Sequence, residues 1–169
     1  MMPAALHPAL HVVLVHPEIP WNTGNIGRTC LATGTSLHLV RPLGFSLVGK
    51  EVLRAGLDYW ENVHPTVWND WQDLEAALCD LGEAFLYSSD GKRDFWAVRY
   101  PPRAVLVFGS ESHGLPPVLR RRFARQTVRI PTTDRNVRSL NLSTAVAVAV
   151  FEVLRQRSQH RASSVQPLQ

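Results

Sequence analysis

Three polar stretches of this 169-residue chain combine amide, carboxylate and guanidinium side chains with glycine and proline, a mixture typical of ligand-binding loops. They read HPEIPWNTGNIGR from residue 16, GSESHGLPP from residue 109 and PTTDRNVRSLNLST from residue 131. Each one directly follows a short apolar run, so each would leave the end of a buried strand. We therefore look for the chemistry of the protein in these three loops.

In the first loop, Asn22 and Arg28 are the side chains that could act on a ligand. Asn22 would present its amide at the start of a helix, beside free backbone N–H groups, or it would serve only as the helix cap. Arg28 lies further along the same helix and could hold a phosphate through two hydrogen bonds, or pair with a surface acid. Gly24 and Gly27 form only GxxG, a weak signal compared with the GxGxxG of dinucleotide-binding loops.

In the second loop, Glu111 stands just past a buried strand, where its carboxylate could accept hydrogen bonds from a ligand or cap the amides of the turn. The stretch from Gly109 to Gly114 has the length of a phosphate-binding P-loop, but Leu115 and Pro116 replace its lysine and hydroxyl residue. The letters SESHG also come near the nucleophile elbow GxSxG, yet they start with serine and are followed by prolines. We therefore expect neither a triphosphate site nor a serine hydrolase.

The third loop leads into the longest predicted helix, and Ser139 and Asn141 offer a hydroxyl and an amide near its start. A helix N-terminus favours an anionic or electron-rich group, although either side chain could simply cap the helix. The two cysteines, Cys30 and Cys79, are far apart in sequence, and no histidine pair has zinc spacing. We therefore expect no metal site.

Positive charge is concentrated in the C-terminal part of the chain. Residues 1–100 hold 7 Lys or Arg and 11 Asp or Glu, whereas residues 101–169 hold 11 Arg and 3 acids. Seven of these arginines fall between Arg120 and Arg138, with Asp134 as the one acid among them. This basic block indicates a surface for a polyanion, above all a nucleic acid, or a merely solvated basic face.

Apolar periodicity predicts alternating strands and helices that would position these loops. The expected strands are residues 10–15, 37–40, a weak one at 63–67, 84–87, 104–108 and 127–130. The expected helices are residues 22–33, 50–55, 70–81, 116–122 and 142–156. Continuous apolar strands between helices predict an α/β fold with a parallel sheet covered on both faces. Ligands bind such sheets beyond the carboxyl ends of the strands, where all three loops would lie.

Length and composition fit one globular domain, which we expect over residues 1–157, with a flexible tail over residues 158–169. Hydrophobic residues make up 45% and charged residues 19%, which excludes a disordered chain. No apolar run reaches the roughly 18 residues of a membrane span, and the N-terminus lacks the pattern of a secretory signal. We therefore expect a cytoplasmic protein that needs no disulfide.

The three loops, taken in this order, resemble the three motifs of the SPOUT methyltransferases. The first, PEIPWNTGNIGR, is similar to the form found in the subfamily that 2′-O-methylates the wobble nucleotide of tRNA. The stretches AGLDYW, FGSESHGLP and RIP…RSLNLSTAVAVAVFE are similar to the same subfamily. The resemblance covers about residues 10–156. Ser110, Ser112 and His113 depart from the usual second motif, which bears on the RNA substrate and not on methyl transfer.

The resemblance implies the α/β knot fold, a parallel sheet flanked by helices whose C-terminal segment forms a trefoil knot. It also implies that S-adenosylmethionine is the cofactor and binds inside the knot. By matching position, the cofactor contacts would be Tyr87, Gly109, Ile130, Ser139 and Leu140. The enzyme would be a homodimer, with the first-motif helix and the last helix at the interface.

The same resemblance implies a catalytic role for Arg28, with Asn22 and Glu111 shaping the site. Because a guanidinium stays protonated at neutral pH, we expect Arg28 to orient a phosphate and stabilise the developing oxyanion rather than act as the base. The residues expected to bind tRNA are Arg120, Arg121, Arg122 and Arg138. The alternatives are 2′-O-methylation of another tRNA position or of rRNA, and a knotted RNA-binding protein without activity.

Overall fold

The computed structural model describes residues 9–47, 57–134 and 136–164. The strands in these residues are β1 Leu10–Val15, β2 Ser36–Val40, β3 Thr66–Trp68, β4 Glu83–Tyr87, β5 Arg93–Asp94, β6 Ala104–Phe108 and β7 Thr127–Arg129. The α-helices are α1 Pro20–Thr33, α3 Trp71–Leu81, α4 Pro117–Arg122 and α5 Leu142–Ser164. The short 3-10 helices are η1 Leu57–Asn62, η2 Phe95–Ala97 and η3 Ala124–Gln126.

The strands form one sheet in the order β3-β2-β1-β6-β4-β7-β5, and every pairing between neighbouring strands is parallel. In the centre, Val107 of β6 pairs with Val13 of β1 on one side and with Leu86 of β4 on the other. Because the strands run the same way, their carboxyl ends share one edge, and the loops after β1, β6 and β7 lie there. The α/β fold with a parallel sheet is therefore confirmed.

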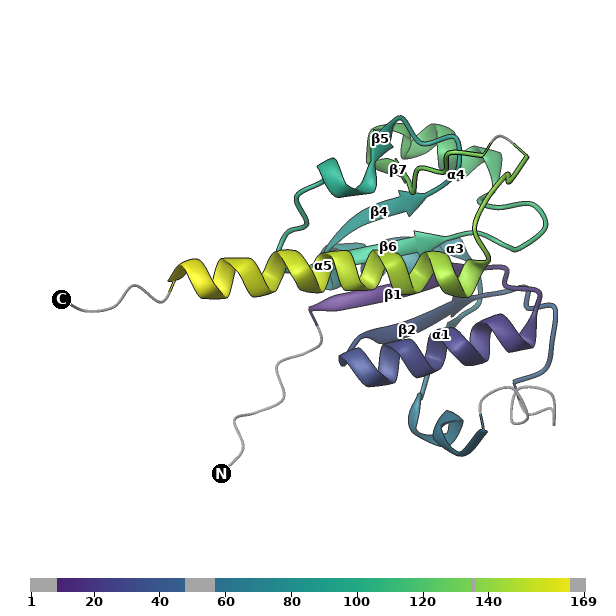
Figure 1. Ribbon diagram of the computed structural model, residues 1–169. Coiled ribbons are helices and arrows are strands. Elements are labelled where there is room, and N and C mark those ends of the chain that lie inside the picture. The colour runs from purple at the N-terminus through teal and green to yellow at the C-terminus, as the bar shows by residue number, and fades with distance from the viewer. Residues whose placement is uncertain (1–8, 48–56, 135, 165–169) are drawn as a thin grey trace, which may run out of the picture.

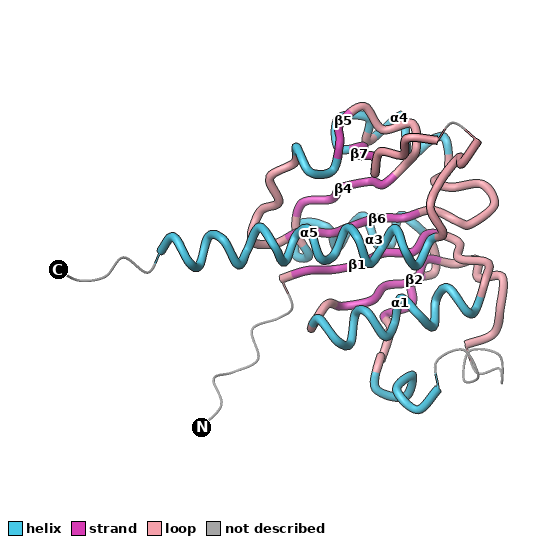
Figure 2. Tube along the Cα trace, in the orientation of Figure 1, coloured by secondary structure: helices cyan, strands magenta, loops and turns pink. Residues whose placement is uncertain are grey.

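Helices cover both faces of this sheet (Figures 1 and 2). α1 and α5 lie side by side on one face, where Leu106 of β6 shares a buried cluster with Ile26 and Val150. α3 lies on the other face, where Val107 shares a second buried cluster with Leu74. Adjacent residues of β6 thus point into opposite apolar layers, which explains why the strand is a continuous apolar run.

Two elements begin two or more residues away from their predicted starts. α1 begins at Pro20 instead of Asn22, and Ile19 occupies the N-cap position without a side-chain hydrogen bond. Proline is favoured at the first turn of a helix because its missing N–H would have no partner there. The third strand is Thr66–Trp68 instead of residues 63–67, because η1 extends to Asn62 and is followed by a turn.

α5 is also longer than expected, since the sequence predicts its end at Gln156 and the structure continues it to Ser164. The start of the predicted tail at residue 158 is therefore helical. The stretch RQRSQHRASS is polar, but Arg, Gln and Ala are good helix formers and no Gly or Pro interrupts them. Apolar periodicity reports only a buried face, so it cannot reveal such an extension. The expected helix at residues 50–55 lies outside the described residues.

Two side chains tie α5 to the rest of the domain. Gln156 accepts a hydrogen bond from the N–H of Tyr100 at 3.2 Å and donates to the carbonyl of Val98 at 2.8 Å. Arg157 donates from Nη2 to the carbonyls of Ala9 and Pro102. Among the described helices, none combines the length and hydropathy that crossing a membrane requires.

Candidate functional site

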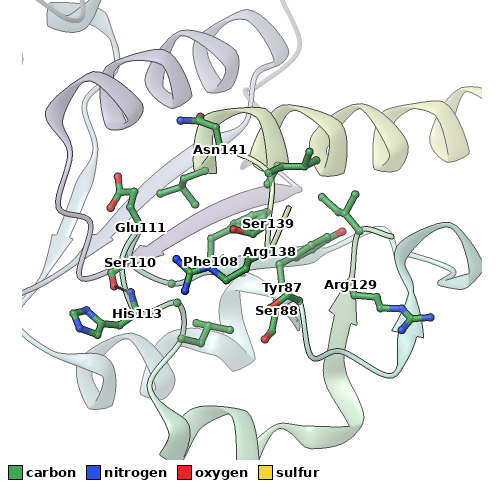
Figure 3. A pocket seen from close by; sticks show the side chains of 18 of the residues that line it. Tyr87, Ser88, Phe108, Ser110, Glu111, His113, Arg129, Arg138, Ser139 and Asn141 are labelled. Atoms are coloured by element: carbon green, nitrogen blue, oxygen red, sulfur yellow. Dashed lines mark hydrogen bonds between the residues drawn. The ribbon is translucent and has the colours of Figure 1, made fainter. Parts of the chain in front are cut away.

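A cavity of about 720 Å³ opens at the carboxyl edge of the sheet, where the loops after β4, β6 and β7 meet the start of α1. Its volume lies in the range of small-molecule sites. It is lined by Ile19, Asn22, residues 87–90, residues 108–115, Arg120, residues 129–132, residues 138–142 and Ala145. Figure 3 shows that acidic, basic and hydroxyl side chains from separate loops surround this space.

The five residues expected to contact the cofactor all line this cavity. They are Tyr87, Gly109, Ile130, Ser139 and Leu140. The first three follow or end strands that are neighbours in the sheet, in the order β6, β4 and β7. The other two lie in the loop that leads into α5. Sheet topology therefore brings together residues that are spread over positions 87–140 of the sequence.

Gly109 is required by the path of its own loop. A Cβ atom at this position would lie 2.0 Å from the carbonyl carbon of Gly114 and 2.1 Å from the nitrogen of Leu115. The loop closes there through two backbone hydrogen bonds, from Ser110 N–H to Gly114 O at 3.1 Å and from Gly114 N–H to Ser110 O at 2.9 Å. The absence of a side chain at residue 109 therefore permits the tight turn that forms this wall of the cavity.

The carboxylate of Glu111 reaches across to the first loop. Its Oε2 accepts the N–H of Glu18 at 2.8 Å, and its Oε1 accepts the N–H of Ile19 at 3.2 Å and Nδ2 of Asn22 at 3.0 Å. These bonds satisfy donors at the start of α1, where the helix dipole also favours a negative charge. Glu111 therefore caps backbone amides, which is one of the two roles expected from the sequence. The capped amides belong to the first loop, 93 positions away, and not to the turn of Glu111 itself.

Asn22 and Asn141 extend this hydrogen-bonded chain to the third loop. Asn141 donates from Nδ2 to Oδ1 of Asn22 at 3.0 Å, and Asn22 in turn donates to Glu111. Asn141 also accepts the N–H of Ser143 at 2.9 Å, so it caps the start of α5. Asn22 is buried and does not cap α1, which begins two residues earlier. One buried amide thus joins all three loops.

A second carboxylate, which the sequence analysis missed, crosses in the opposite direction. Glu18 accepts the N–H of Ser112 at 3.0 Å and also its hydroxyl, and Nδ1 of His113 lies 3.6 Å from Oε1 of Glu18. The hydrogen bonds from Ser112, with a smaller contribution from His113, hold the pKa of Glu18 below its usual value. No local pattern marks Glu18, because its partner Ser112 is 94 positions away.

Tyr87 offers the cavity an aromatic wall rather than a proton donor. The hydroxyl of Tyr100 donates to the carbonyl of Phe95 at 3.2 Å, so the Tyr87 hydroxyl, 2.6 Å away, donates to Tyr100. Burial raises the pKa of Tyr87 well above its usual range and that of Tyr100 to about 12. The ring of Tyr87 stacks on Phe108 with centroids 4.6 Å apart.

Arg28 is not among the residues that line the cavity. It is exposed on α1, and its guanidinium carbon lies 5.3 Å from the centre of the Tyr59 ring, in the range of a cation–π contact. The structure therefore brings Asn22 and Glu111 into direct contact but leaves Arg28 outside their cluster.

Two of the four arginines expected to bind tRNA are already paired with acids. Arg120 lines the cavity, and its Nη1 lies 2.5 Å from Oδ2 of Asp90. Arg122 does not line the cavity, and its Nη2 lies 2.6 Å from Oε1 of Glu75 on α3. These ion pairs neutralise part of the positive charge that the sequence predicts for binding RNA.

The other two predicted RNA contacts, Arg121 and Arg138, are exposed and form no salt bridge within the described part of the chain. Arg138 lines the cavity, and Figure 3 shows its side chain among those that surround the space. Arg121 lies on α4, outside the cavity lining. The arginines best able to meet a phosphate are therefore Arg121 and Arg138, because no carboxylate holds them.

Comparisons with known proteins identify the family of this chain. The model of the SpoU rRNA methylase family matches residues 9–151. A tRNA (cytidine(34)-2′-O)-methyltransferase from Burkholderia pseudomallei is 48% identical over 148 residues, 86% of this chain and 94% of that protein. A structure solved to study 2-OH methylation of C/U34 on tRNA has a TM-score of 0.84 and 43% identity, covering 89% of this chain and 97% of that chain. An AdoMet-bound rRNA methyltransferase from Sinorhizobium meliloti has a TM-score of 0.73 and 27% identity, over 89% of this chain and 58% of that one. The chain therefore belongs to the SpoU methylase family.

Proposed function

We propose that this protein transfers a methyl group from S-adenosylmethionine to the ribose 2′-hydroxyl of the wobble nucleotide of tRNA, cytidine or uridine 34. The observation that carries this proposal is the cavity at the carboxyl edge, which gathers all five residues expected to contact the cofactor. The substrate is supported by the relative from Burkholderia pseudomallei, which matches 86% of this chain and is named for cytidine 34.

The residues of the cavity fit S-adenosylmethionine. The side chains of Tyr87, Ile130 and Leu140 offer apolar surface to a purine, while Ser139 and the backbone at Gly109 offer polar groups. A volume of about 720 Å³ suits a ligand of that size. When bound, the cofactor supplies an electrophilic methyl group on its sulfonium.

The chain's own residues align the acceptor. The hydrogen bonds from Asn141 to Asn22 and from Asn22 to Glu111 fix the three loops relative to one another, so a ribose held between them has one orientation. Such positioning can lower a barrier by several kcal/mol. Glu111 already accepts three hydrogen bonds from the protein, so its carboxylate is engaged in positioning the loops. Arg138, unpaired at the cavity, would neutralise a phosphate of the bound nucleotide.

We further propose a homodimer that buries α1 and α5. Trp21 and Leu31 of α1 are 51% and 43% exposed, and Phe151 of α5 is 59% exposed. Exposed large apolar side chains mark an interaction surface, and these two helices lie side by side (Figure 1). Replacing Phe151 with Asp should yield monomers in analytical ultracentrifugation. A dimer that survives this change would put the interface on another surface.

This dimer would bring Arg28 to the active site from the neighbouring protomer. Arg28 follows Trp21 by seven residues, about two turns, so both project from the same exposed side of α1. An interface built on that side would hold Arg28 against the partner. There it would orient a phosphate and stabilise the oxyanion that develops as the 2′-hydroxyl loses its proton.

The trefoil knot belongs to the same proposal. The chain leaves β7 near one end of the strand order and returns through residues 131–141 to lay α5 over the sheet centre, beside α1 (Figure 1). A threaded return of this kind past the loop after β6 would form the knot. We assign the protein to the cytoplasm, where tRNA is present and the free thiols of Cys30 and Cys79 would stay reduced.

The decisive experiment is methyl transfer from labelled S-adenosylmethionine to tRNA isolated from a strain that lacks the enzyme, followed by nucleoside mapping. Label in a 2′-O-methylated pyrimidine at position 34 is the expected result. Label at another tRNA position, or in rRNA assayed in parallel, would identify a different site of methylation. Absence of cofactor binding in calorimetry would favour the RNA-binding protein without activity.

A further inference from the structure

We propose that the connection between β4 and β6 is a second RNA contact, in which Trp96 stacks on an unpaired base of tRNA and Lys92, Arg93 and Arg99 bind neighbouring phosphates. This inference rests on the proposed function, because it adds a further surface for the same RNA substrate. It concerns residues that line neither the cavity nor the proposed dimer surface.

The side chain of Trp96 is largely exposed to solvent. Trp96 lies in η2 and is 59% exposed, although its neighbours Phe95, Val98 and Tyr100 are buried. The connection therefore has apolar anchors of its own and does not need the indole for folding. An exposed tryptophan loses the stabilisation that burial of its large ring would give, so a binding role accounts for it better than a structural one.

The connection is held rigidly beneath Trp96. The carbonyl of Phe95 accepts the N–H of Val98 at 3.3 Å and the hydroxyl of Tyr100 at 3.2 Å. Gln156 of α5 bonds both to the N–H of Tyr100 and to the carbonyl of Val98. The backbone that carries the indole is thus fixed before any partner arrives, which reduces the entropy lost on binding.

The surroundings of Trp96 are positively charged. Lys92, Arg93 and Arg99 are exposed, and none of them forms a salt bridge within residues 57–134. Both acids of the connection are occupied by arginines outside it. Nε of Arg129 lies 2.6 Å from Oδ1 of Asp94, and Nη1 of Arg120 lies 2.5 Å from Oδ2 of Asp90. The unpaired cations therefore favour a polyanion at this surface.

The connection is bonded to the wall of the cavity. Arg129 lines the cavity and bonds to Asp94, which precedes Trp96 by only two residues. Two residues span at most about 7 Å. Trp96 therefore follows closely on a residue bonded to the cavity wall, and we expect an RNA chain with one nucleotide in the cavity to extend to the indole. Arg93 also donates to the carbonyl of Arg125 at 3.4 Å, which joins the connection to the basic block.

The chemistry favours RNA over a protein partner. Trp96 is the one exposed large apolar side chain of this connection, and its exposed neighbours include cations and no other large apolar residue. Cores of protein interfaces are depleted in charge. Proteins that bind unpaired RNA combine an aromatic ring for base stacking with cations for the backbone.

The test compares tRNA affinity and turnover for Trp96→Ala, Trp96→Phe and the double variant Lys92→Ala with Arg99→Ala. Val118→Ala is the matched control, because Val118 is 58% exposed on α4. We expect Trp96→Ala to raise the Kd for an unmodified tRNA transcript about 5- to 150-fold, the range for one base stack. Trp96→Phe should retain most of the affinity. The double variant should reduce the salt dependence of log K by about 2.

Equal tRNA affinity of Trp96→Ala and Val118→Ala would overturn the inference. A change in sedimentation with Trp96→Ala and no change in RNA binding would overturn it too, since Trp96 would then contact protein. Because the main readout is binding, these outcomes hold even if the wild-type protein transfers no methyl group to tRNA, a result that would refute only the proposed function.

Discussion

Glu18 and Glu111 hold each other's loops in place. The N–H of Glu18 donates to Oε2 of Glu111 at 2.8 Å, while the carboxylate of Glu18 accepts the N–H of Ser112, the residue after Glu111, at 3.0 Å. The loop after β1 and the loop after β6 are therefore tied in both directions. Hydrogen bonds to a charged group are stronger than neutral ones, so this crossed arrangement stabilises the rim of the cavity.

Glu111→Gln should lower stability and weaken cofactor binding together. A glutamine keeps one acceptor oxygen, but its amide group would face at least one of the donors at Glu18, Ile19 and Asn22. An unsatisfied donor costs about 1–3 kcal/mol. Urea unfolding and calorimetry with S-adenosylmethionine measure both effects, with Thr132→Ala, another cavity-lining change, as the control. Loss of turnover with unchanged stability and affinity would make Glu111 a catalytic residue instead.

Gly109→Ala should destroy the cofactor site through the backbone. Its Cβ would lie 2.0 Å from the carbonyl carbon of Gly114, so the loop after β6 must open. Gly34→Ala is the control. Gly34 has a φ of 65°, which strains any residue with a side chain, but a Cβ atom there would contact nothing within 4 Å. We expect Gly34→Ala to cost about 1 kcal/mol of stability and to keep cofactor affinity. Normal cofactor binding by Gly109→Ala would show that this loop does not form the site.

The framework could be predicted because its strands are buried on both faces. β1 and β6 have the expected bounds, since LHVVLV and AVLVF are continuous apolar runs with turn residues after them. The apolar pattern gives no comparable signal for elements that are exposed to solvent. It therefore missed the two-residue strand Arg93–Asp94 and the polar end of α5.

The cavity could be predicted from the order of the loops, since parallel strands must gather their carboxyl ends. The partners of its side chains could not be predicted. Asn22 looked like a helix cap, yet Pro20 starts the helix earlier and frees the amide for Asn141 and Glu111. The sequence likewise counts the charges of the basic block, but only the structure reveals that Glu75 holds Arg122.

Arg121→Ala should weaken tRNA binding more than Arg122→Ala. The guanidinium of Arg122 lies 2.6 Å from Glu75, whereas Arg121 has no salt bridge in the described residues. Each lost phosphate contact lowers the slope of log K against log salt by about 1, so only Arg121→Ala should reduce the slope. Filter binding over a salt series measures it. Equal slopes for the two variants would indicate that the RNA does not contact α4.

Arg28→Ala should abolish turnover and leave cofactor affinity unchanged, because Arg28 lies outside the cavity. If Arg28 acts on the neighbouring protomer, inactive variants should complement each other. We pair Arg28→Ala with Ser139→Trp, which fills the cavity. In a mixed dimer, the first chain supplies an intact cavity and the second supplies Arg28, so one of two sites recovers.

Tandem affinity tags isolate the mixed dimer, and single-turnover methylation of tRNA measures its activity. Recovery of about half of the wild-type activity is the expected result. A mixed dimer as inactive as its parents would assign Arg28 to its own protomer's site. Turnover of Arg28→Ala at the wild-type rate would remove Arg28 from the mechanism altogether.

A chain of neutral rings links three neighbouring strands, β1, β2 and β3. The indole N–H of Trp68 donates to Nδ1 of His38 at 3.1 Å, so Nε2 of His38 carries the proton and faces Nδ1 of His11 at 3.0 Å. A second proton on His38 would face the indole N–H. Burial, with a smaller contribution from His11, lowers the pKa of His38 to about 4.

Stability should therefore rise with pH between about 4 and 6.5. The unfolded chain binds a proton at His38 near pH 6.5, while the folded protein resists protonation until about pH 4, so acid favours unfolding across that window. The difference between pH 5 and pH 7 should be about 2 kcal/mol. Urea unfolding across this range measures it, and His64→Asn, an exposed site, should leave the slope unchanged. A free energy of unfolding that is flat from pH 5 to pH 7 would mean that His38 titrates normally in the folded protein.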